Sequence, residues 1–375
     1  MAGTAKHGAV AAGHICLDIT PQWPQGESIQ GGLLPGRLYE MTGVNIHTGG
    51  AVANTGLAMK ILGADVRLAG KVGKDYLGEI VLEQLGKYGA EKDMIVADRE
   101  QTSYSAVIAP PGIDRIFLHQ PGANDTFSLS DLKDGLLEDS VLFHFGYPPL
   151  MRKMYGDGGR ELEALLSHVR GRGLATSLDM ASVNENTGAG CADWRGILRR
   201  VLPYVDFFMP SAEELAYMLD RDRYERWIER ASGKDITSVL NIERDVMPLA
   251  ETALAMGAGV VLIKCGVAGL CCCSAGAKQL ADISGRMNSD LSDWSDRNHQ
   301  EKCYRPGRIL SGTGAGDTSI AAFLCAALRG FPFDKTLRLT SGTGASCVES
   351  YDALSGLRSF KELEQKIAGG WKKYN

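Results

Sequence analysis

An acidic residue ends a glycine-rich run in residues 311–324, which read SGTGAGDTSIAAFL. A glycine turn that enters a helix presents free backbone N–H groups and the positive end of the helix dipole, which together attract an anion such as phosphate. Asp317 at that helix start could accept the proton of a substrate hydroxyl while the N–H groups of Gly314, Ala315 and Gly316 neutralise a transferring phosphoryl group. The same carboxylate could instead be a helix cap, and spacing alone does not separate these two interpretations.

Two other phosphate-binding loops do not match this run. A Walker loop needs Lys and then Ser or Thr after its last glycine, whereas Asp317 and Thr318 stand here. A dinucleotide fingerprint needs GxGxxG early in the chain with an acid about twenty residues later. GTGAGD offers only GxGxG, and it lies late in the sequence. The near-copy SGTGAS at 341–346 lacks the acid, so we expect it to supply small residues inside the next helix.

Composition favours a small-molecule partner over a polymer. The 375 residues carry a net charge of −5 without a basic block, which argues against nucleic acid. No secretory leader or run of about eighteen apolar residues is visible, so we expect a cytoplasmic protein without membrane contact. Of the nine cysteines, Cys271–Cys273 are consecutive and no CxxC pair occurs, which predicts buried, reduced cysteines on a strand.

Short β-like runs alternate with amphipathic helical stretches, which predicts an α/β fold with a mostly parallel central sheet flanked by helices. The expected strands lie near 9–15, 65–72, 141–147, 174–180, 205–209 and 260–265. Segments 19–49 and 101–120 carry Pro, Gly and β-type alternation but no helix, and they predict a small antiparallel sheet projecting from the core. The polar segment 284–302 is expected to be a surface insertion, and the charged helix at 221–235 to be peripheral.

The glycine loop resembles the C-terminal signature of the ribokinase, or PfkB, family of sugar kinases, whose usual form is close to DTxGAGD. Residues 47–85 resemble the N-terminal signature of that family, with a GG pair, Asn54 and a GxDxxG segment that begins at Gly73. The resemblance extends from about residue 9 to 365. It implies one ribokinase-like domain over residues 1–375, in which the two irregular segments form a β lid and a possible homodimer contact.

The resemblance also implies an ATP-dependent reaction, with Mg²⁺ as cofactor, on a hydroxymethyl group of a sugar or polyol. Asp317 matches the catalytic base of the family, and the preceding loop residues match its anion hole. Positions that bind the sugar hydroxyls match Asp18, Gly50 and Asn54, and positions beside the nucleotide match Lys264, Gly266, Gly269, Thr313 and Ser341. From the strand pattern itself, we expect Asp18 just past the first strand and Asn54 in the first turn of a helix, facing one crevice.

Three positions depart from the family pattern. The family has Asn, two residues and then Glu where this chain has Ser211 and Glu214, so Glu214 either organises Mg²⁺ through water or forms a capping box. Ser311 replaces an acid that helps to hold a monovalent cation, which makes activation by potassium doubtful. Lys264 replaces the usual Thr, and its ammonium could reach phosphate or point to solvent.

The acceptor is expected to be a neutral sugar or polyol, with a sugar phosphate or a nucleoside as the alternative. A phosphorylated acceptor favours two or more converging Lys or Arg side chains, and segment 101–120 offers one arginine, Arg115, with His119 nearby. An alternative of another class is a sugar sensor without catalysis. The intact Asp317 and the unbroken glycine loop argue against it.

Overall fold

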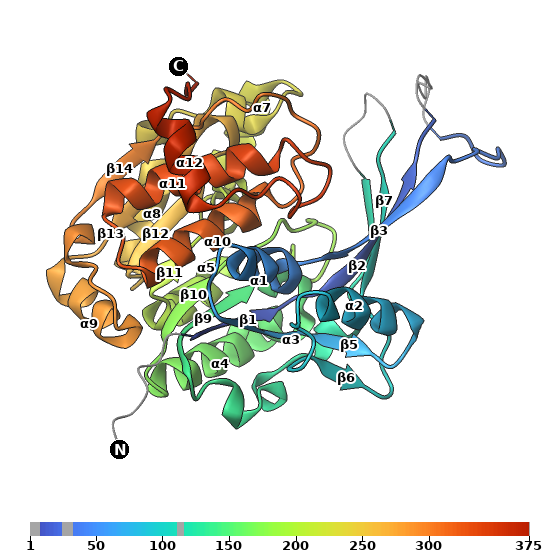
Figure 1. Cartoon of the computed structure of the whole chain (residues 1–375), viewed down its shortest axis with the longest axis horizontal. Helices are drawn as coiled ribbons and strands as arrows, with labels where there is room; N and C mark the ends of the chain where they lie inside the picture. The colour runs from blue at the N-terminus through green and yellow to red at the C-terminus, as the bar shows by residue number, and fades with distance from the viewer. Residues whose placement is uncertain (1–7, 25–32, 111–115, 375) are drawn as a thin grey trace.

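A computed structural model describes residues 8–24, 33–110 and 116–374. Figure 1 shows one large sheet covered by helices, from which a second, smaller sheet projects to one side. None of the helices within these ranges is long and apolar enough to cross a membrane.

The large sheet has eight strands in the order β14-β13-β12-β11-β10-β9-β1-β4. Their bounds are β1 (Gly8–Gly13), β4 (Val66–Ala69), β9 (Ser140–Gly146), β10 (Ala175–Leu178), β11 (Phe207–Phe208), β12 (Val260–Lys264), β13 (Leu270–Ser274) and β14 (Asn298–Glu301). The strands from β4 to β12 pair in parallel, with Ala11 opposite both Leu68 and His144, whereas β13 is antiparallel to its two neighbours. The predicted, mostly parallel sheet is therefore confirmed.

Helices cover both faces of this sheet, which explains why its strands read as continuous apolar runs. Their bounds are α1 (Ala51–Ile61), α2 (Tyr76–Gly86), α3 (Arg152–Tyr155), α4 (Arg160–Gly171), α5 (Trp194–Val201), α6 (Ala212–Leu219), α7 (Arg221–Ala231), α8 (Met247–Ala255), α9 (Ala277–Met287), α10 (Ala315–Leu328), α11 (Phe333–Cys347) and α12 (Phe360–Ala368). One apolar core lies between the sheet and α1, α2 and α9–α12, and the other lies beneath α4–α8. Helix α10 packs between α1 and α11, and its alanines allow the close approach (Figure 1).

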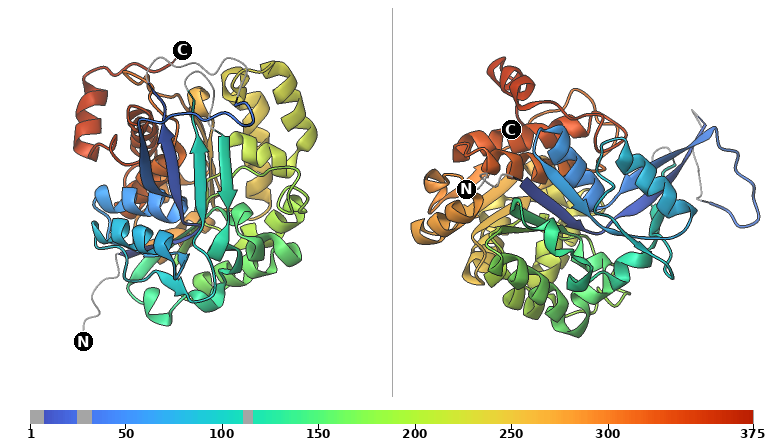
Figure 2. Two further views of the ribbon diagram at one scale, coloured as in Figure 1. Left: turned by 90° about the vertical axis from the view of Figure 1, so that its right-hand side faces the viewer. Right: turned by 60° about the horizontal axis from the view of Figure 1, so that its bottom comes forward.

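The smaller sheet is built from the two irregular segments, in the order β3-β2-β7-β8. Its strands, which stand side by side in the left view of Figure 2, are β2 (Cys16–Gln22), β3 (Gly43–Gly49), β7 (Tyr104–Ile108) and β8 (Ile116–Gln120). The hairpin between β7 and β8 is the one that we predicted. The sheet is mixed, however, because β2 and β7 both leave the core as first strands of their hairpins and so pair in parallel. The parts of the predicted lid at 25–32 and 111–115 lie outside the described residues.

The prediction of a surface insertion at 284–302 is wrong. Helix α9 continues to Met287, Trp294 is fully buried in the core, and β14 adds an edge strand to the large sheet. Polar letters dominate this segment because an edge strand and a helix end expose most of their side chains, so a few buried residues carry the packing. A further pair of short parallel strands, β5 (Lys71–Gly73) and β6 (Ile95–Ala97), lies beside α2.

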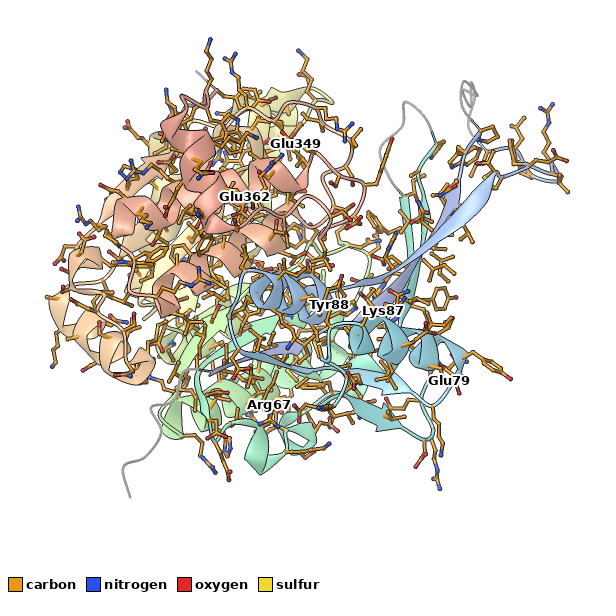
Figure 3. All side chains as sticks on the ribbon, in the orientation of Figure 1. Arg67, Glu79, Lys87, Tyr88, Glu349 and Glu362 are labelled. Atoms are coloured by element: carbon orange, nitrogen blue, oxygen red, sulfur yellow. The ribbon has the colours of Figure 1, made fainter. Side chains whose placement is uncertain are left out.

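Charged side chains fix two peripheral parts of the framework (Figure 3). Arg67 on the edge strand β4 forms a bidentate ion pair with Asp93, and both N···O distances are 2.7 Å. Glu349 accepts a hydrogen bond from the Gly307 N–H at 2.7 Å and pairs with Arg358, so it holds the segment that leads to the glycine loop. The three consecutive cysteines are buried in β13, and all three are free thiols, as predicted.

Candidate active site

The glycine loop starts α10 at the edge of the sheet where the parallel strands have their carboxyl ends. Gly314 is the N-cap residue with φ 75°, and a Cβ built on it would lie 2.2 Å from the Cβ of Ala353, so only glycine fits. Ala315, Gly316 and Asp317 form the first turn, whose leading N–H groups have no acceptor inside the helix. Because ligands of open α/β sheets bind at this edge, these N–H groups are placed to receive an anion.

The Asp317 carboxylate receives its hydrogen bonds from other elements and does not cap its own helix. Asn54 Nδ2 donates to Oδ2 at 3.0 Å, and Thr55 Oγ1 donates to Oδ1 at 3.4 Å, both from α1. The hydroxyl of Tyr147, just after β9, lies 2.7 Å from Oδ1 and 2.9 Å from Oδ2. Burial raises the pKa of Asp317, while these donors and the Lys264 charge work to lower it. The structure therefore rules out the helix-cap interpretation.

Lys264 ends β12 inside the protein and flanks the glycine loop. Its Nζ lies 2.6 Å from Asp179 Oδ1, just after β10, and both side chains are largely buried. A Cβ built on Gly316 would lie 3.7 Å from the same Nζ, so the ammonium lies beside the start of α10 and does not point to solvent. Burial works to lower the pKa of Lys264, but the carboxylates of Asp179 and Glu214 outweigh it and raise the pKa.

The predicted sugar-binding residues meet at the base of the smaller sheet. Asp18 does not lie just past the first strand, as we expected, because β1 ends at Gly13 and Asp18 lies inside β2. A Cβ on Gly49 would lie 2.3 Å from Asp18 Oδ2, and burial raises the pKa of Asp18. Gly50 caps α1 with φ 85°, and its Cβ would lie 2.6 Å from His14 Nδ1. Gly49 therefore leaves room for the Asp18 carboxylate, and Gly50 lets the start of α1 approach His14.

Several polar residues at this edge were missed by the sequence analysis. His14 Nε2 lies 3.4 Å from His119 Nε2, and His119 Nδ1 lies 3.0 Å from Ser105 Oγ, which links the core to the smaller sheet. Burial lowers the pKa of both histidines. Tyr147 and Asp179 lie at the carboxyl ends of the strands predicted at 141–147 and 174–180, so the rule that ligands bind at this end of a strand could have found them.

The remaining predicted residues lie around this centre in different roles. Ser211 and Glu214 form the capping box, in which the Ser211 N–H donates to Glu214 Oε2 at 2.7 Å. Gly266 and Gly269 turn the chain between β12 and β13 with φ 52° and 102°. Thr313 Oγ1 accepts a hydrogen bond from Ser311 Oγ at 3.0 Å.

The second glycine run lies within α11, as predicted. Ser341 Oγ donates to the carbonyl of Lys302 at 3.1 Å, so its hydroxyl is already engaged. A Cβ built on Gly344 would lie 2.4 Å from Ser319 Oγ of α10. The small residues of the second run therefore serve the close packing of α11 against α10.

Metal binding at this site would depend on single carboxylates together with waters and substrate phosphates. Within residues 8–24, 33–110 and 116–374 no group of three or more His, Cys, Asp and Glu side chains could hold a metal by itself. Mg²⁺ is usually bound through one or two carboxylates, waters and substrate phosphates. The Glu214 carboxylate lies close enough to act electrostatically on both Asp179 and Lys264, and a carboxylate oxygen is a ligand type that Mg²⁺ accepts.

Known carbohydrate kinases are similar to this chain. The family model described as pfkB family carbohydrate kinase matches residues 27–359. The chain is 23% identical over 305 residues to an uncharacterized sugar kinase of Archaeoglobus fulgidus, which covers 80% of this chain and 98% of that protein.

The solved structures that resemble this chain share its fold at low sequence identity. The ribokinase of Arabidopsis thaliana complexed with ribose and ATP has a TM-score of 0.68 and 17% identity, covering 96% of this chain and 97% of that one. The nucleoside kinase of Methanocaldococcus jannaschii, an archaeal member of the ribokinase family, has a TM-score of 0.63 and 16% identity, covering 98% and 100%. The predicted ribokinase-like fold is confirmed.

Proposed function

Because this chain belongs to the pfkB family of carbohydrate kinases, we propose that it transfers the γ-phosphate of ATP to a hydroxymethyl group of a neutral sugar or polyol. The observation that carries the proposal is the convergence on Asp317. Its buried carboxylate lies at the start of a glycine-capped helix, with the Lys264 ammonium beside the same turn. The proposed base and anion site thus belong to the first turn of α10, and the Lys264 ammonium of β12 lies beside it, which supports the proposal.

Asp317 is the general base in this proposal. It accepts the proton of the acceptor hydroxyl while the hydroxyl oxygen bonds to the γ-phosphorus and the bond from that phosphorus to ADP breaks. The N–H groups at Gly314, Ala315 and Gly316 stabilise the phosphoryl oxygens. Lys264 adds a positive charge at the same place, and its ion pair with Asp179 holds the ammonium there.

ATP is supported as donor because the similar ribokinase of Arabidopsis thaliana contains ATP. Lys264, Gly266, Gly269, Thr313 and Ser341 are the proposed nucleotide-binding residues, although the Ser341 hydroxyl is engaged by Lys302. Glu214 would hold Mg²⁺ through water, and the ion would supply charge neutralisation on the phosphates. The Ser311 hydroxyl donates a hydrogen bond to Thr313 Oγ1 and offers no carboxylate, which argues against activation by potassium.

The proposed acceptor site contains Asp18, Gly50 and Asn54, whose polar atoms suit hydroxyl groups. Lys264 is a cation that acts on Asp317, and it forms an ion pair with Asp179. One paired ammonium does not make a pocket for a second phosphate, which supports a neutral acceptor. A nucleoside is the alternative acceptor, and one structural neighbour is a nucleoside kinase.

The test is a measurement of ADP formation from ATP and Mg²⁺ with sets of neutral sugars, polyols, sugar phosphates and nucleosides. We expect turnover with one or more neutral sugars or polyols. Turnover confined to sugar phosphates or nucleosides would replace the proposed acceptor. Binding of a sugar without any ADP formation would instead identify a sensor protein.

We also propose that the protein works in the cytoplasm, where ATP is available. We further propose that two copies pair through the smaller sheet. Apolar side chains on this sheet are exposed, including Val44 at 52%, Ile116 at 50% and Leu118 at 58%. Exposed apolar groups on a small sheet are typical of an interaction surface. The molar mass in solution tests the pairing, and a strictly monomeric protein at micromolar concentration would contradict it.

A further inference from the structure

Tyr147 has a backbone conformation that aims its side chain at the catalytic loop. It follows β9 with φ 66° and ψ 42°, which is the left-handed region that L-residues other than Asn and Asp seldom adopt. A Cβ on the preceding Gly146 would lie 2.1 Å from the Cβ of Ala51, and Pro148 and Pro149 follow. The chain is therefore fixed on both sides of Tyr147, and strained residues of this kind concentrate at functional sites.

The Tyr147 hydroxyl bridges both oxygens of Asp317. Its distances of 2.7 Å and 2.9 Å are shorter than those of Asn54 and Thr55, which each reach a single oxygen from α1. Donors on two sides fix the plane of the carboxylate as well as its position. Asp317 thus has a preset orientation before any acceptor binds.

The hydrogen bond from Tyr147 also affects the protonation state of Asp317. Burial raises the pKa of Asp317, and the largest contribution that opposes this rise is the hydrogen bond from Tyr147. Burial and the Asp317 charge raise the pKa of Tyr147 well above its usual value, so its hydroxyl remains a proton donor.

Five other titratable groups interact electrostatically with Asp317, and they come from four further elements or strand ends. They are Lys264 of β12, Asp179 after β10, Asp18 and Cys16 of β2, and Cys347 of α11. Burial raises the pKa of both thiols, which keeps them neutral, and Asp179 pairs with Lys264. Tyr147, in contrast, donates a hydrogen bond to the Asp317 carboxylate directly.

We propose that Tyr147 is a positioning residue of the kinase reaction, whose hydroxyl keeps the Asp317 carboxylate ionised and turned towards the acceptor hydroxyl. The inference rests on the proposed function, because it assigns Asp317 the role of base. The inference adds Tyr147, at the end of β9, to the candidate active site, in which the glycine loop and α1 provide other residues around Asp317.

The first test compares Tyr147→Phe with wild type in the pH dependence of kcat/KM. Without the hydroxyl, Asp317 holds its proton to higher pH, so the acid limb should move up by about one pH unit. The ratio of wild-type to variant kcat/KM should be about tenfold on the acid limb and should shrink as pH rises. Tyr217→Phe is the matched control, because its hydroxyl donates to the Gly190 carbonyl at 3.2 Å, outside this site.

A uniform loss at every pH, or an acid limb that stays in place, would show a structural role only and would overturn the inference. A control variant that shifts the limb equally would overturn it as well.

The second test needs no turnover, so it separates this inference from the proposed function. A double-mutant cycle of Tyr147→Phe and Asp317→Ala, measured by urea unfolding at pH 8, should give unfolding constants that deviate about tenfold from additivity. Additive effects would overturn the role of Tyr147, whether or not the protein is a kinase. If the cycle shows clear coupling but the wild-type protein phosphorylates no acceptor in the screen, the contact between Tyr147 and Asp317 is supported and the proposed function is overturned.

Discussion

Replacing Lys264 by Met tests the buried ion pair beside the glycine loop. Met keeps most of the volume of the side chain but removes the ammonium, whose Nζ lies 2.6 Å from Asp179 Oδ1. Asp179 is 1% exposed and would lose its ionic partner inside the protein. Breaking a buried pair from one side costs about 3–5 kcal/mol, because an uncompensated charge is left behind.

The cost of this substitution should depend on pH. Burial raises the pKa of Asp179 in wild type, and Lys264 opposes that rise, so the pKa should rise further in Lys264→Met. The folded variant then holds the Asp179 proton to higher pH than the folded wild type does. Since a folded state that retains a proton loses stability as pH rises, the deficit of the variant should grow with pH.

Urea unfolding between pH 5 and pH 9 measures this deficit. We expect about 3–5 kcal/mol at the alkaline end and a clearly smaller value at pH 5. Lys335→Met is the matched control, because its 2.7 Å ion pair with Glu364 is partly exposed and should contribute less than about 1 kcal/mol. A deficit under 1 kcal/mol, or one that does not change with pH, would refute the reasoning about this pair.

Two glycine variants test the close contacts of the site. Gly50→Ala should destabilise the protein by several kcal/mol more than Gly173→Ala in urea unfolding. Both glycines have φ 85°, but a Cβ on Gly50 would lie 2.6 Å from His14, whereas a Cβ on Gly173 would meet no atom within 4 Å. Equal costs would contradict the steric argument. The free energy of unfolding of Gly316→Ala should lie within about 1 kcal/mol of the wild-type value, because the nearest atoms to its Cβ belong to Lys264 and lie at ordinary contact distances. Its kcat/KM should fall about 10²-fold, because a methyl group enters the anion site. Full kinase activity of that variant would exclude phosphate from this turn.

Much of the framework follows from local patterns in the sequence. The parallel strands read as apolar runs because both faces are covered, and the glycine loop ends in a helix start because Gly314 adopts φ 75°. The hairpin between β7 and β8 follows from its alternation and turn residues. These features depend on neighbouring residues, so one sequence is enough to predict them.

Other features depend on contacts between distant segments and were missed. Tyr147 meets Asp317 from 170 residues away, and nothing local indicates that its backbone is left-handed. Asp18 is expected just past the first strand but lies inside β2, because only two residues separate β1 from β2. The segment around Trp294 resembles an insertion in the sequence because its polar side chains outnumber a few buried residues, among them Leu291 and Trp294.

The most direct test of the account compares wild type with Asp317→Asn in ATP-dependent phosphorylation of an acceptor found in the screen. The amide keeps the shape of the carboxyl group and can still accept from Tyr147, but it cannot take the acceptor proton. We expect kcat to fall roughly 10²–10⁴-fold, as for the loss of a general base, with ATP binding unchanged by calorimetry. Turnover by Asp317→Asn near the wild-type rate would contradict the assignment of Asp317 as the base.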